Sequence, residues 1–318
     1  MKSQTRGKFV VALAAFGLCM LFAAGASAIP ADLGSAVCGA QLAGMPDYDW
    51  WYGCSPTAVG MVLGKYDRDG YGVMSYDNIA PGGDAELRLT PGVSNDAATR
   101  ASYPIASSFI ASTGYVSDFY VSGYGASGDD LGPIHTFDCL ADFMGTSQDA
   151  AGNWNGSTTL YFFTNGSPLH YYQIPGYGIT TSSGMYGIYE YLSYAGYGGY
   201  VVDIYNQLSD NDAYGLGLTF DFDLADFQAE IDAGRPVVVH IIGHSMMAYG
   251  YDAAGNIYID DTWGLGTGTM PWGGSYAGSP MWGVTTVQML ATPEPATLCL
   301  IILGGSAIGL YRTRRRRR

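Results

Sequence analysis

The chain has 318 residues, of which 48% are hydrophobic and 14% aromatic, and its formal net charge is −14 at pH 7. This content of apolar and aromatic residues is sufficient for a folded core and excludes a disordered chain. All 28 acidic residues lie between positions 29 and 295, so that part repels nucleic acid and anionic lipid head groups; its basic residues are Lys65, Arg68, Arg88, Arg100 and Arg235.

Residues 1–28 have the three parts of a secretory signal peptide. A basic start precedes the apolar run FVVALAAFGLCMLFAAG, and Ala26-Ser27-Ala28 provides small residues for cleavage. The alternative is an uncleaved membrane anchor, although the apolar run is short for a bilayer span. We therefore expect export by Sec-type machinery.

Residues 29–290 have the size of one large domain or of two lobes, and their Gly and Tyr content favours strands and turns over long helices. We expect an extended lead-in over 29–49. The expected helices lie at 55–66, within 96–113, and at 135–145, 184–196 and 224–231. The expected strands lie at 157–163, 199–205, 237–242, 246–252 and 256–261.

The first expected helix carries an apolar stripe at Val59, Val62, Leu63 and Tyr66, which are spaced i, i+3, i+4 and i+7. Proline is tolerated in a first helical turn, and Pro56 fits there. The preceding Cys54 therefore falls at or just before the helix N-terminus, where the helix dipole favours the reactive thiolate.

The helix expected after position 223 shows a capping-box spacing, Asp223-Leu-Ala-Asp226, with Gly234 able to end it. The strand that follows contains His240, which we interpret either as a core residue or as one that supports the site residues. His244 lies beyond it between Gly243 and Ser245, where the strand bends, and is better placed for exposure.

Two carboxylates, Asp260 and Asp261, end the next expected strand. Neighbouring strand residues point to opposite faces, so only one of the two side chains can hold the imidazole of His244, and the alternation does not choose between them. A thiol at a helix start, an imidazole and a carboxylate are the nucleophile, base and orienting group of a cysteine hydrolase.

The segments GCSPTAVGM, GRPVVVHIIGHSMMAYGYD and YIDDTWG resemble the C39-like branch of papain-fold cysteine peptidases. The resemblance implies an α+β, papain-like fold, in which the N-terminal catalytic helix packs on an antiparallel β-sheet. It also implies that Cys54 is the nucleophile, His244 the general base and Asp261 the orienting carboxylate, with a peptide or protein as substrate.

The sequence departs from this family in two places. The family has a glutamine about six positions before the cysteine, where this chain has Tyr48, and Thr262 replaces the common proline after the aspartate. Tyr48, Trp50 or backbone N–H groups are the candidates for the oxyanion donor. Supporting roles beside the catalytic residues fall to Ser55 and Asp260.

The cysteine count leaves two alternatives for the exported part, which contains Cys38, Cys54 and Cys139. One is a Cys38–Cys139 disulfide with Cys54 free, and the other is three reduced thiols. We expect no cofactor and no metal. Calcium remains an alternative at the Asp-rich fragments 66–72, 209–215 and 220–223, although none completes an EF-hand pattern.

Residues 291–318 form a distinctive tail. Pro293-Glu294-Pro295 precedes an apolar stretch from Ala296 to Tyr311, and an arginine cluster follows. This order resembles the PEP-CTERM sorting signal of bacterial exported proteins, which implies recognition by an exosortase after transient anchoring by a C-terminal membrane helix. A plain membrane anchor is the alternative, and in both cases arginines hold this end in the cytoplasm.

These features predict an exported, surface-sorted cysteine peptidase located in the cell envelope or outside the cell. The alternative is a binding or structural protein of the extracellular matrix that keeps the papain-like fold without turnover. A third hypothesis is an amide or ester hydrolase that acts on polysaccharide-linked substrates.

Overall fold

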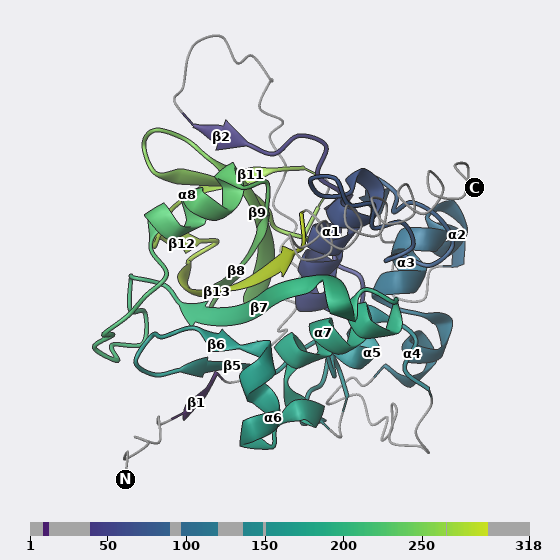
Figure 1. Cartoon of the computed structure of the whole chain (residues 1–318), viewed down its shortest axis with the longest axis horizontal. Helices are drawn as coiled ribbons and strands as arrows, with labels where there is room; N and C mark the ends of the chain where they lie inside the picture. Colours follow the sequence, from purple (N-terminus) through teal and green to yellow (C-terminus); the bar gives the residue numbers. More distant parts are fainter. Residues whose placement is uncertain are drawn as a thin grey trace, which may run out of the picture.

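The computed structural model describes residues 9–12, 39–89, 97–119, 136–148, 151–264 and 266–291. In this part the chain is a mixed α+β protein built on one large, mostly antiparallel sheet (Figure 1). The sheet has nine strands in the order β11-β10-β9-β8-β13-β7-β6, with β12 added to β13 and β2 added to β9. This arrangement confirms the coarse α+β prediction.

The large sheet and two small ribbons, β1–β5 and the parallel pair β3–β4, contain all the strands of the described residues. The strands are β1 (Phe9–Ala12), β2 (Ala40–Gln41), β3 (Asp47–Tyr48), β4 (Arg88–Leu89), β5 (Leu160–Phe163), β6 (Leu169–His170), β7 (Val201–Leu208), β8 (Val237–Ile241), β9 (His244–Tyr251), β10 (Asn256–Asp260), β11 (Gly268–Pro271), β12 (Ser275–Tyr276) and β13 (Ser279–Met289).

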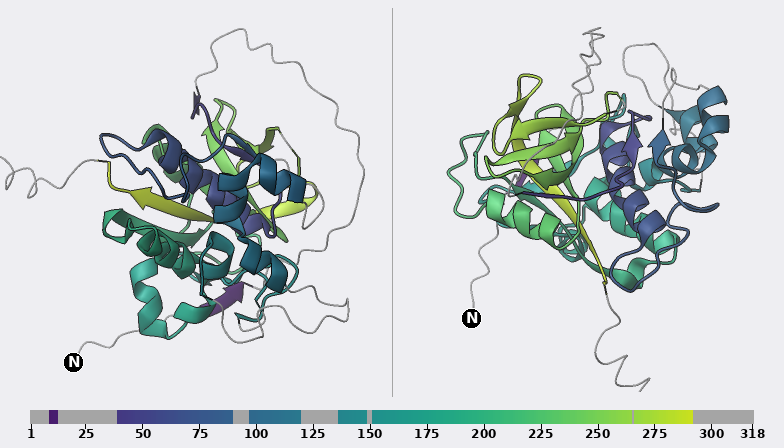
Figure 2. Two further views of the ribbon diagram at one scale, coloured as in Figure 1. Left: turned by 90° about the vertical axis from the view of Figure 1, so that its right-hand side faces the viewer. Right: turned by 90° about the horizontal axis from the view of Figure 1, so that it is seen from above.

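The helices lie on both sides of the large sheet (Figures 1 and 2). They are α1 (Cys54–Asp69), α2 (Ala97–Ser102), α3 (Pro104–Ile110), α4 (Thr113–Asp118), α5 (Leu140–Phe143), α6 (Ile174–Tyr177), α7 (Gly184–Tyr194) and α8 (Leu224–Asp232), with short 3-10 turns at η2 (Tyr171–Gln173), η3 (Thr180–Ser182) and η4 (Gly198–Tyr200).

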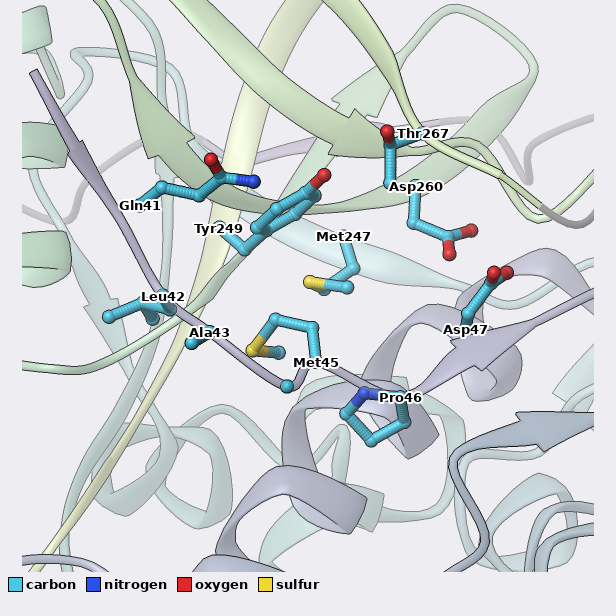
Figure 3. A pocket seen from close by; sticks show the side chains of 11 residues that line it. Gln41, Leu42, Ala43, Met45, Pro46, Asp47, Met247, Tyr249, Asp260 and Thr267 are labelled. Carbon is cyan, nitrogen blue, oxygen red and sulfur yellow. The ribbon is translucent and has the colours of Figure 1, made fainter. Parts of the chain in front are cut away.

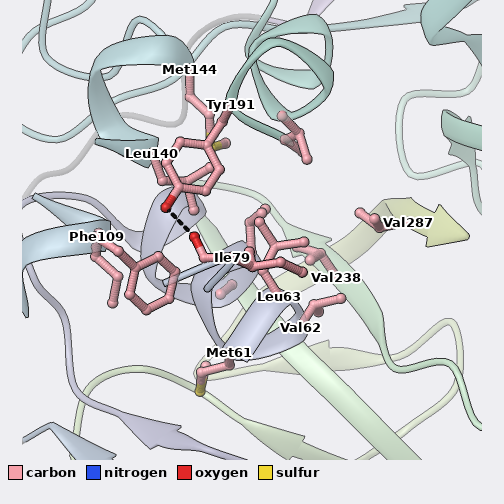
Figure 4. Packing of buried hydrophobic residues seen from close by; sticks show 14 of the residues in the cluster. Met61, Val62, Leu63, Ile79, Phe109, Leu140, Met144, Tyr191, Val238 and Val287 are labelled. Carbon is pink, nitrogen blue, oxygen red and sulfur yellow. Dashed lines mark hydrogen bonds between the residues drawn. The ribbon is translucent and has the colours of Figure 1, made fainter. Parts of the chain in front are cut away.

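Helix α1 packs against β8 and β9 and is buried along most of its length. The predicted stripe of this helix lies in the larger hydrophobic core, together with side chains of α3, α5, α7 and the sheet (Figure 4). In this core the hydroxyl of Tyr191 donates a hydrogen bond of 2.7 Å to the backbone oxygen of Ile79, which satisfies a buried polar group. The close packing fixes the position of the helix relative to the sheet.

The opposite face of the sheet is covered by α8, which contacts β2, β8 and β9. The predicted capping box is confirmed: the carboxylate of Asp223 accepts a hydrogen bond of 2.9 Å from the N–H of Asp226, and the carboxylate of Asp226 accepts one of 3.1 Å from the N–H of Asp223. Phe227 and Ile231 point into the smaller core on this face.

The single helix expected within 96–113 is replaced by three short helices, α2, α3 and α4. Pro104 opens α3, because it cannot supply the N–H that would continue α2. Ser112 then caps α4 by accepting a hydrogen bond of 3.1 Å from the N–H of Tyr115. Proline and serine therefore divide into short helices a segment for which one helix was expected.

Strand β1 lies inside the predicted signal peptide and pairs antiparallel with β5. It belongs to a separate two-stranded ribbon, so the nine-stranded sheet does not depend on it. None of the helices in the described ranges has the length and apolar character needed to cross a bilayer. The predicted sorting motif Pro293-Glu294-Pro295 and its apolar stretch lie outside those ranges.

Candidate active site

Cys54 is the first residue of α1, and its side chain is only 7% exposed. The loop before it is held by two hydrogen bonds around Thr57: the N–H of Trp51 donates to Oγ1 over 3.0 Å, and this hydroxyl donates to the oxygen of Gly53 over 2.6 Å. The helix start is therefore rigid. Its unpaired N–H groups and dipole favour a negative charge on the sulfur.

His244 opens β9 directly after the tight turn that follows β8. Ile241 pairs with His244 across this hairpin, and Gly243 in the loop has a φ of 86°, a conformation that glycine adopts without strain. The hairpin thus brings the imidazole of His244 to the N-terminal end of α1. His244 is 6% exposed to solvent.

The two ring nitrogens of His244 have different partners. Nε2 lies 2.6 Å from the backbone oxygen of Asp261 and 3.3 Å from the hydroxyl of Thr262. A carbonyl oxygen only accepts, so Nε2 carries a hydrogen and donates it. Nδ1 is left to face the sulfur of Cys54.

The sulfur and the imidazole shift each other's protonation. Burial alone raises the pKa of Cys54, but the charge of His244, its hydrogen bond and the N–H of Ser245 lower that pKa below its ordinary value. Burial alone lowers the pKa of His244, yet the negative sulfur and the carbonyl of Asp261 raise it above its usual value. These opposite shifts are those of a thiolate–imidazolium pair.

The carboxylate of Asp261 has partners other than the imidazole. It accepts hydrogen bonds of 2.9 Å from the N–H of Trp263 and 2.7 Å from the hydroxyl of Tyr276. Asp261 was expected to orient His244 through its side chain, and the structure shows its main-chain oxygen in that position instead. The side chain of Asp261 instead holds Trp263 and Tyr276, the two aromatic residues that cover the site.

That cover is an aromatic stack. The indole of Trp263 lies on His244 with ring centroids 4.2 Å apart and an interplanar angle of 24°, and the ring of Tyr276 stacks with the same indole at 6.1 Å and 25°. Trp263 is 53% exposed, so it shields the imidazole from solvent while standing at the surface. The residues of the three predicted segments are therefore brought together.

No family model matches the chain, and neither a curated protein nor a solved structure matches it.

The expected oxyanion donors lie elsewhere or are already engaged. Tyr48 is fully buried near Gly64 of α1, and its hydroxyl donates to the oxygen of Glu86 over 2.7 Å. The N–H of Trp50 donates to the oxygen of Thr262. The N–H of Cys54 stands at the start of the helix, where it has no intrahelical acceptor, and is the best-placed donor.

Asp260 and Ser55, expected as supporting residues, lie on different elements: Asp260 ends β10, and Ser55 is the second residue of α1. Asp260 is 1% exposed and accepts a hydrogen bond of 3.0 Å from the N–H of Thr262. This bond holds the loop whose Thr262 hydroxyl contacts His244. Burial and the neighbouring Asp47 raise the pKa of Asp260 well above its usual value. Ser55 contacts Ser245 over 2.9 Å.

Asp47 and Asp260 line a pocket of about 220 Å³ between the lead-in and the sheet (Figure 3). Met45 and Met247 provide apolar walls beside these carboxyl groups. Figure 3 draws both carboxyl groups at one end of the pocket, away from Gln41. The pocket adjoins β10, the strand that ends at Asp260.

The remaining thiol of the described residues, Cys139, is buried and free. Its sulfur lies 3.4 Å from the carboxylate of Asp142, and burial first, then this carboxylate, raise its pKa. Cys139 is a free thiol in the structure; Cys38 lies outside the described residues, so the Cys38–Cys139 pairing stays a prediction.

The Asp-rich fragments use their carboxylates to bind backbone N–H groups. Asp67 accepts from Ala80 and Ala85 at 2.8 and 2.7 Å, and Asp212 accepts at 2.7 Å from both residues 216 and 217. These carboxylates therefore stabilise the local backbone of their segments. Within the described ranges, one group could hold a metal ion, and it consists of Asp138, Cys139 and Asp142.

Sequence reasoning missed the roles of Thr262 and Trp263. Both act at His244, one through its hydroxyl and the other through its ring. The only signal was their position directly after the carboxylate, in a loop that must pass the imidazole. A ring-stacking role leaves no distinctive spacing in a sequence.

Proposed function

We propose that this chain is an exported cysteine peptidase of the C39-like, papain-fold kind. The observation that carries the proposal is the pair formed by Cys54 and His244, with the thiol pKa lowered and the imidazole pKa raised against the effect of burial. Perturbed pairs of this kind are typical of nucleophilic sites. A helix that begins at the cysteine and packs on an antiparallel sheet carrying the histidine agrees with a papain-like arrangement.

The reaction would be acyl transfer from a peptide bond. The thiolate of Cys54 attacks the carbonyl carbon, and the N–H of Cys54 at the helix start binds the developing oxyanion. The imidazolium of His244 gives its Nδ1 proton to the leaving amine, which departs as the thioester forms. A water molecule then gives a proton to Nδ1 and attacks the thioester, which releases the acid and restores the thiolate.

The surroundings support this cycle by keeping the imidazole in one orientation. The carbonyl of Asp261 accepts the Nε2 hydrogen of His244 at every stage, while Trp263 keeps bulk water from one face of the ring. Fixing the tautomer in this way leaves Nδ1 free for the proton transfers.

The location follows from the two ends of the sequence. We propose that residues 1–28 direct export and that residues 291–318 anchor the chain in the membrane until an exosortase recognises Pro293-Glu294-Pro295. The catalytic body would then act in the cell envelope or outside the cell, on a peptide or protein substrate.

The direct test compares the purified wild-type protein with Cys54→Ala on a broad peptide mixture under reducing conditions, with cleavage followed by mass spectrometry. We expect wild-type cleavage and none above background for the variant. Equal cleavage by both proteins would show that Cys54 is not the nucleophile.

The protonation of Cys54 gives a second, independent measurement. Alkylation by iodoacetamide requires thiolate, so the lowered pKa predicts reaction at Cys54 at acidic pH, where an ordinary thiol is protonated. His244→Ala removes the opposing cation and leaves burial to raise the pKa, so alkylation at pH 6 should fall by about tenfold or more.

The rate of peptide cleavage should rise as pH increases through the lowered pKa of Cys54 and fall as pH increases through the raised pKa of His244. An alkylation rate at pH 6 that is the same in wild type and His244→Ala would contradict the ion pair. Alkylation should be quantified on the peptide containing Cys54, because Cys139 is a second thiol.

The main alternative is a binding or structural protein that keeps the fold without turnover. Two observations favour it: Cys54 is only 7% exposed, and the hydroxyl of Tyr48 is engaged by Glu86 where the family has its glutamine donor. Alkylation of Cys54 without any peptide cleavage would support this alternative over the peptidase.

A further inference from the structure

A continuous chain of buried polar side chains runs from the start of α1 across four strands of the sheet. Ser55 contacts Ser245 over 2.9 Å, and Ser245 contacts Nδ1 of His240 over 3.0 Å. On the far side of the ring, Nε2 lies 2.8 Å from Thr285, whose hydroxyl donates to Asn206 over 2.6 Å. None of these five residues is more than 2% exposed.

The far end of this chain fixes the direction of its hydrogen bonds. The amide nitrogen of Asn206 donates to the backbone oxygen of Tyr161 over 3.1 Å, and a carbonyl only accepts. The amide oxygen of Asn206 therefore faces Thr285 and takes the single hydroxyl hydrogen of that residue. It follows that Thr285 accepts from Nε2 of His240.

His240 is a neutral link in this chain. Trp282 stacks on its ring at 5.3 Å and Phe162 meets it edge-on at 6.1 Å, so the imidazole has an aromatic enclosure. Burial, followed by the charge of His244, lowers the pKa of His240 to about 3. With its one hydrogen on Nε2, His240 must accept at Nδ1 from the hydroxyl of Ser245.

The near end of the chain meets the nucleophile. Ser245 has given its only hydrogen to His240, so its oxygen must accept the hydrogen of Ser55. The Ser55 hydroxyl lies within hydrogen-bond reach of the sulfur of Cys54, and a hydrogen bond from it would lower the pKa of Cys54 if its hydrogen pointed to the sulfur. The direction of the chain turns that hydrogen away.

We propose that Ser245 is a positioning residue that, held by His240, takes the hydrogen of Ser55 and leaves His244 as the only side-chain donor to the sulfur of Cys54. This inference rests on the proposed function, because it assigns the proton of the nucleophile to one partner alone. That partner must return the proton to the leaving amine, and a competing hydroxyl donor would stabilise the thiolate and make it a poorer nucleophile.

The test measures the pH midpoint of Cys54 alkylation by iodoacetamide in the full-length protein, read from the mass of the peptide that contains Cys54. Ser245→Ala removes the acceptor and frees Ser55 to donate to the thiolate, so the midpoint should fall by about one pH unit. The double variant Ser55→Ala/Ser245→Ala should lose that fall, and Ser245→Thr, which keeps a hydroxyl, should keep the wild-type midpoint.

The single variant Ser55→Ala tests the proposal even if substitutions of Ser245 prevent folding. If the Ser55 hydroxyl donates no hydrogen bond to the sulfur of Cys54, its removal leaves the pH midpoint of alkylation unchanged. If the hydroxyl does donate to the sulfur, its removal raises that midpoint. The matched control is Ser107→Ala, which removes another buried hydroxyl, one that donates to the oxygen of Tyr103 over 2.6 Å in α3.

A midpoint that rises in Ser55→Ala, or stays unchanged or rises in Ser245→Ala, overturns the role of Ser245. That result would leave the proposed peptidase intact if wild-type Cys54 still reacts at acidic pH. A wild-type Cys54 that shows no acidic titration overturns the proposed function itself, and the role of Ser245 with it.

Discussion

The orienting group of the candidate site is a main-chain atom. Nε2 of His244 donates to the carbonyl of Asp261, while the carboxylate of the same residue binds Trp263 and Tyr276. In a triad the orienting carboxylate also stabilises the imidazolium by its charge. Here most of the orientation comes from the backbone, and the carboxylate acts at a greater distance.

Asp261→Ala should therefore lower kcat/KM by about tenfold, far less than the roughly 10⁴-fold loss typical when a triad carboxylate is replaced. The loss has a physical reason, since Trp263 and Tyr276 lose the acceptor that fixes their stack on His244. Steady-state kinetics on a cleaved peptide would measure it, with Tyr276→Phe as a milder change to the same contact. A loss as large as that of Cys54→Ala would instead assign the orienting role to the side chain.

The sequence contained the reactive residues but not their geometry. Cys54 and His244 could be selected because a helix start and a strand bend are readable patterns, and their chemistry is specific. The choice between Asp260 and Asp261 could not be made, since the atom that meets the imidazole is a carbonyl, which every residue possesses. The chain of Ser55, Ser245 and His240 was also invisible, because it depends on how strands pair.

At the scale of elements, local signals predicted well where they were strong. Helix α1, the capping box of α8 and the strands β8, β9 and β10 lie close to their expected positions. Strand β13 had no prediction, although it is the longest strand and lies between β7 and β8. Most of its residues are buried on both faces, so it lacks the alternation of apolar and polar residues that identifies a half-buried strand.

The capping box of α8 is expected to stabilise the sheet face that it covers. Asp223→Ala removes the acceptor of the Asp226 N–H and should reduce the free energy of unfolding by about 1 kcal/mol. Urea denaturation would measure this difference. The matched control is Asp221→Ala, which removes the same charge from an exposed position just before the cap; an equal loss in both variants would point to charge rather than capping.

At the scale of the whole molecule, acidic residues outnumber basic ones, and the carboxyl groups of Asp47, Asp49, Asp260 and Asp261 are electrostatic neighbours. Burial and the neighbours Asp47 and Asp261 raise the pKa of Asp49 to about 7, and burial likewise raises that of Asp260. A carboxyl group with a raised pKa keeps its proton in the folded state after the unfolded chain has released it. Stability therefore falls as pH rises above the ordinary range of aspartate.

Asp260→Asn should flatten this dependence, because an amide cannot ionise and can still accept from the N–H of Thr262. One such group lowers the free energy of unfolding by up to about 1.4 kcal/mol per pH unit. This decrease begins above the pKa of the unfolded chain and ends once the pH has passed the pKa of the folded protein. We expect the variant to gain stability over wild type between pH 5 and pH 8 in urea denaturation. Parallel curves for the two proteins would show that Asp260 ionises normally.

The backbone origin of the contact to His244 has an evolutionary consequence. A carbonyl survives any substitution that preserves the path of the loop, so descendants of this protein could exchange the residue at position 261 without losing the contact. A comparison that looks for three invariant side chains would then classify a working homologue as degenerate. Conservation of loop length between β10 and β11 would be the better criterion.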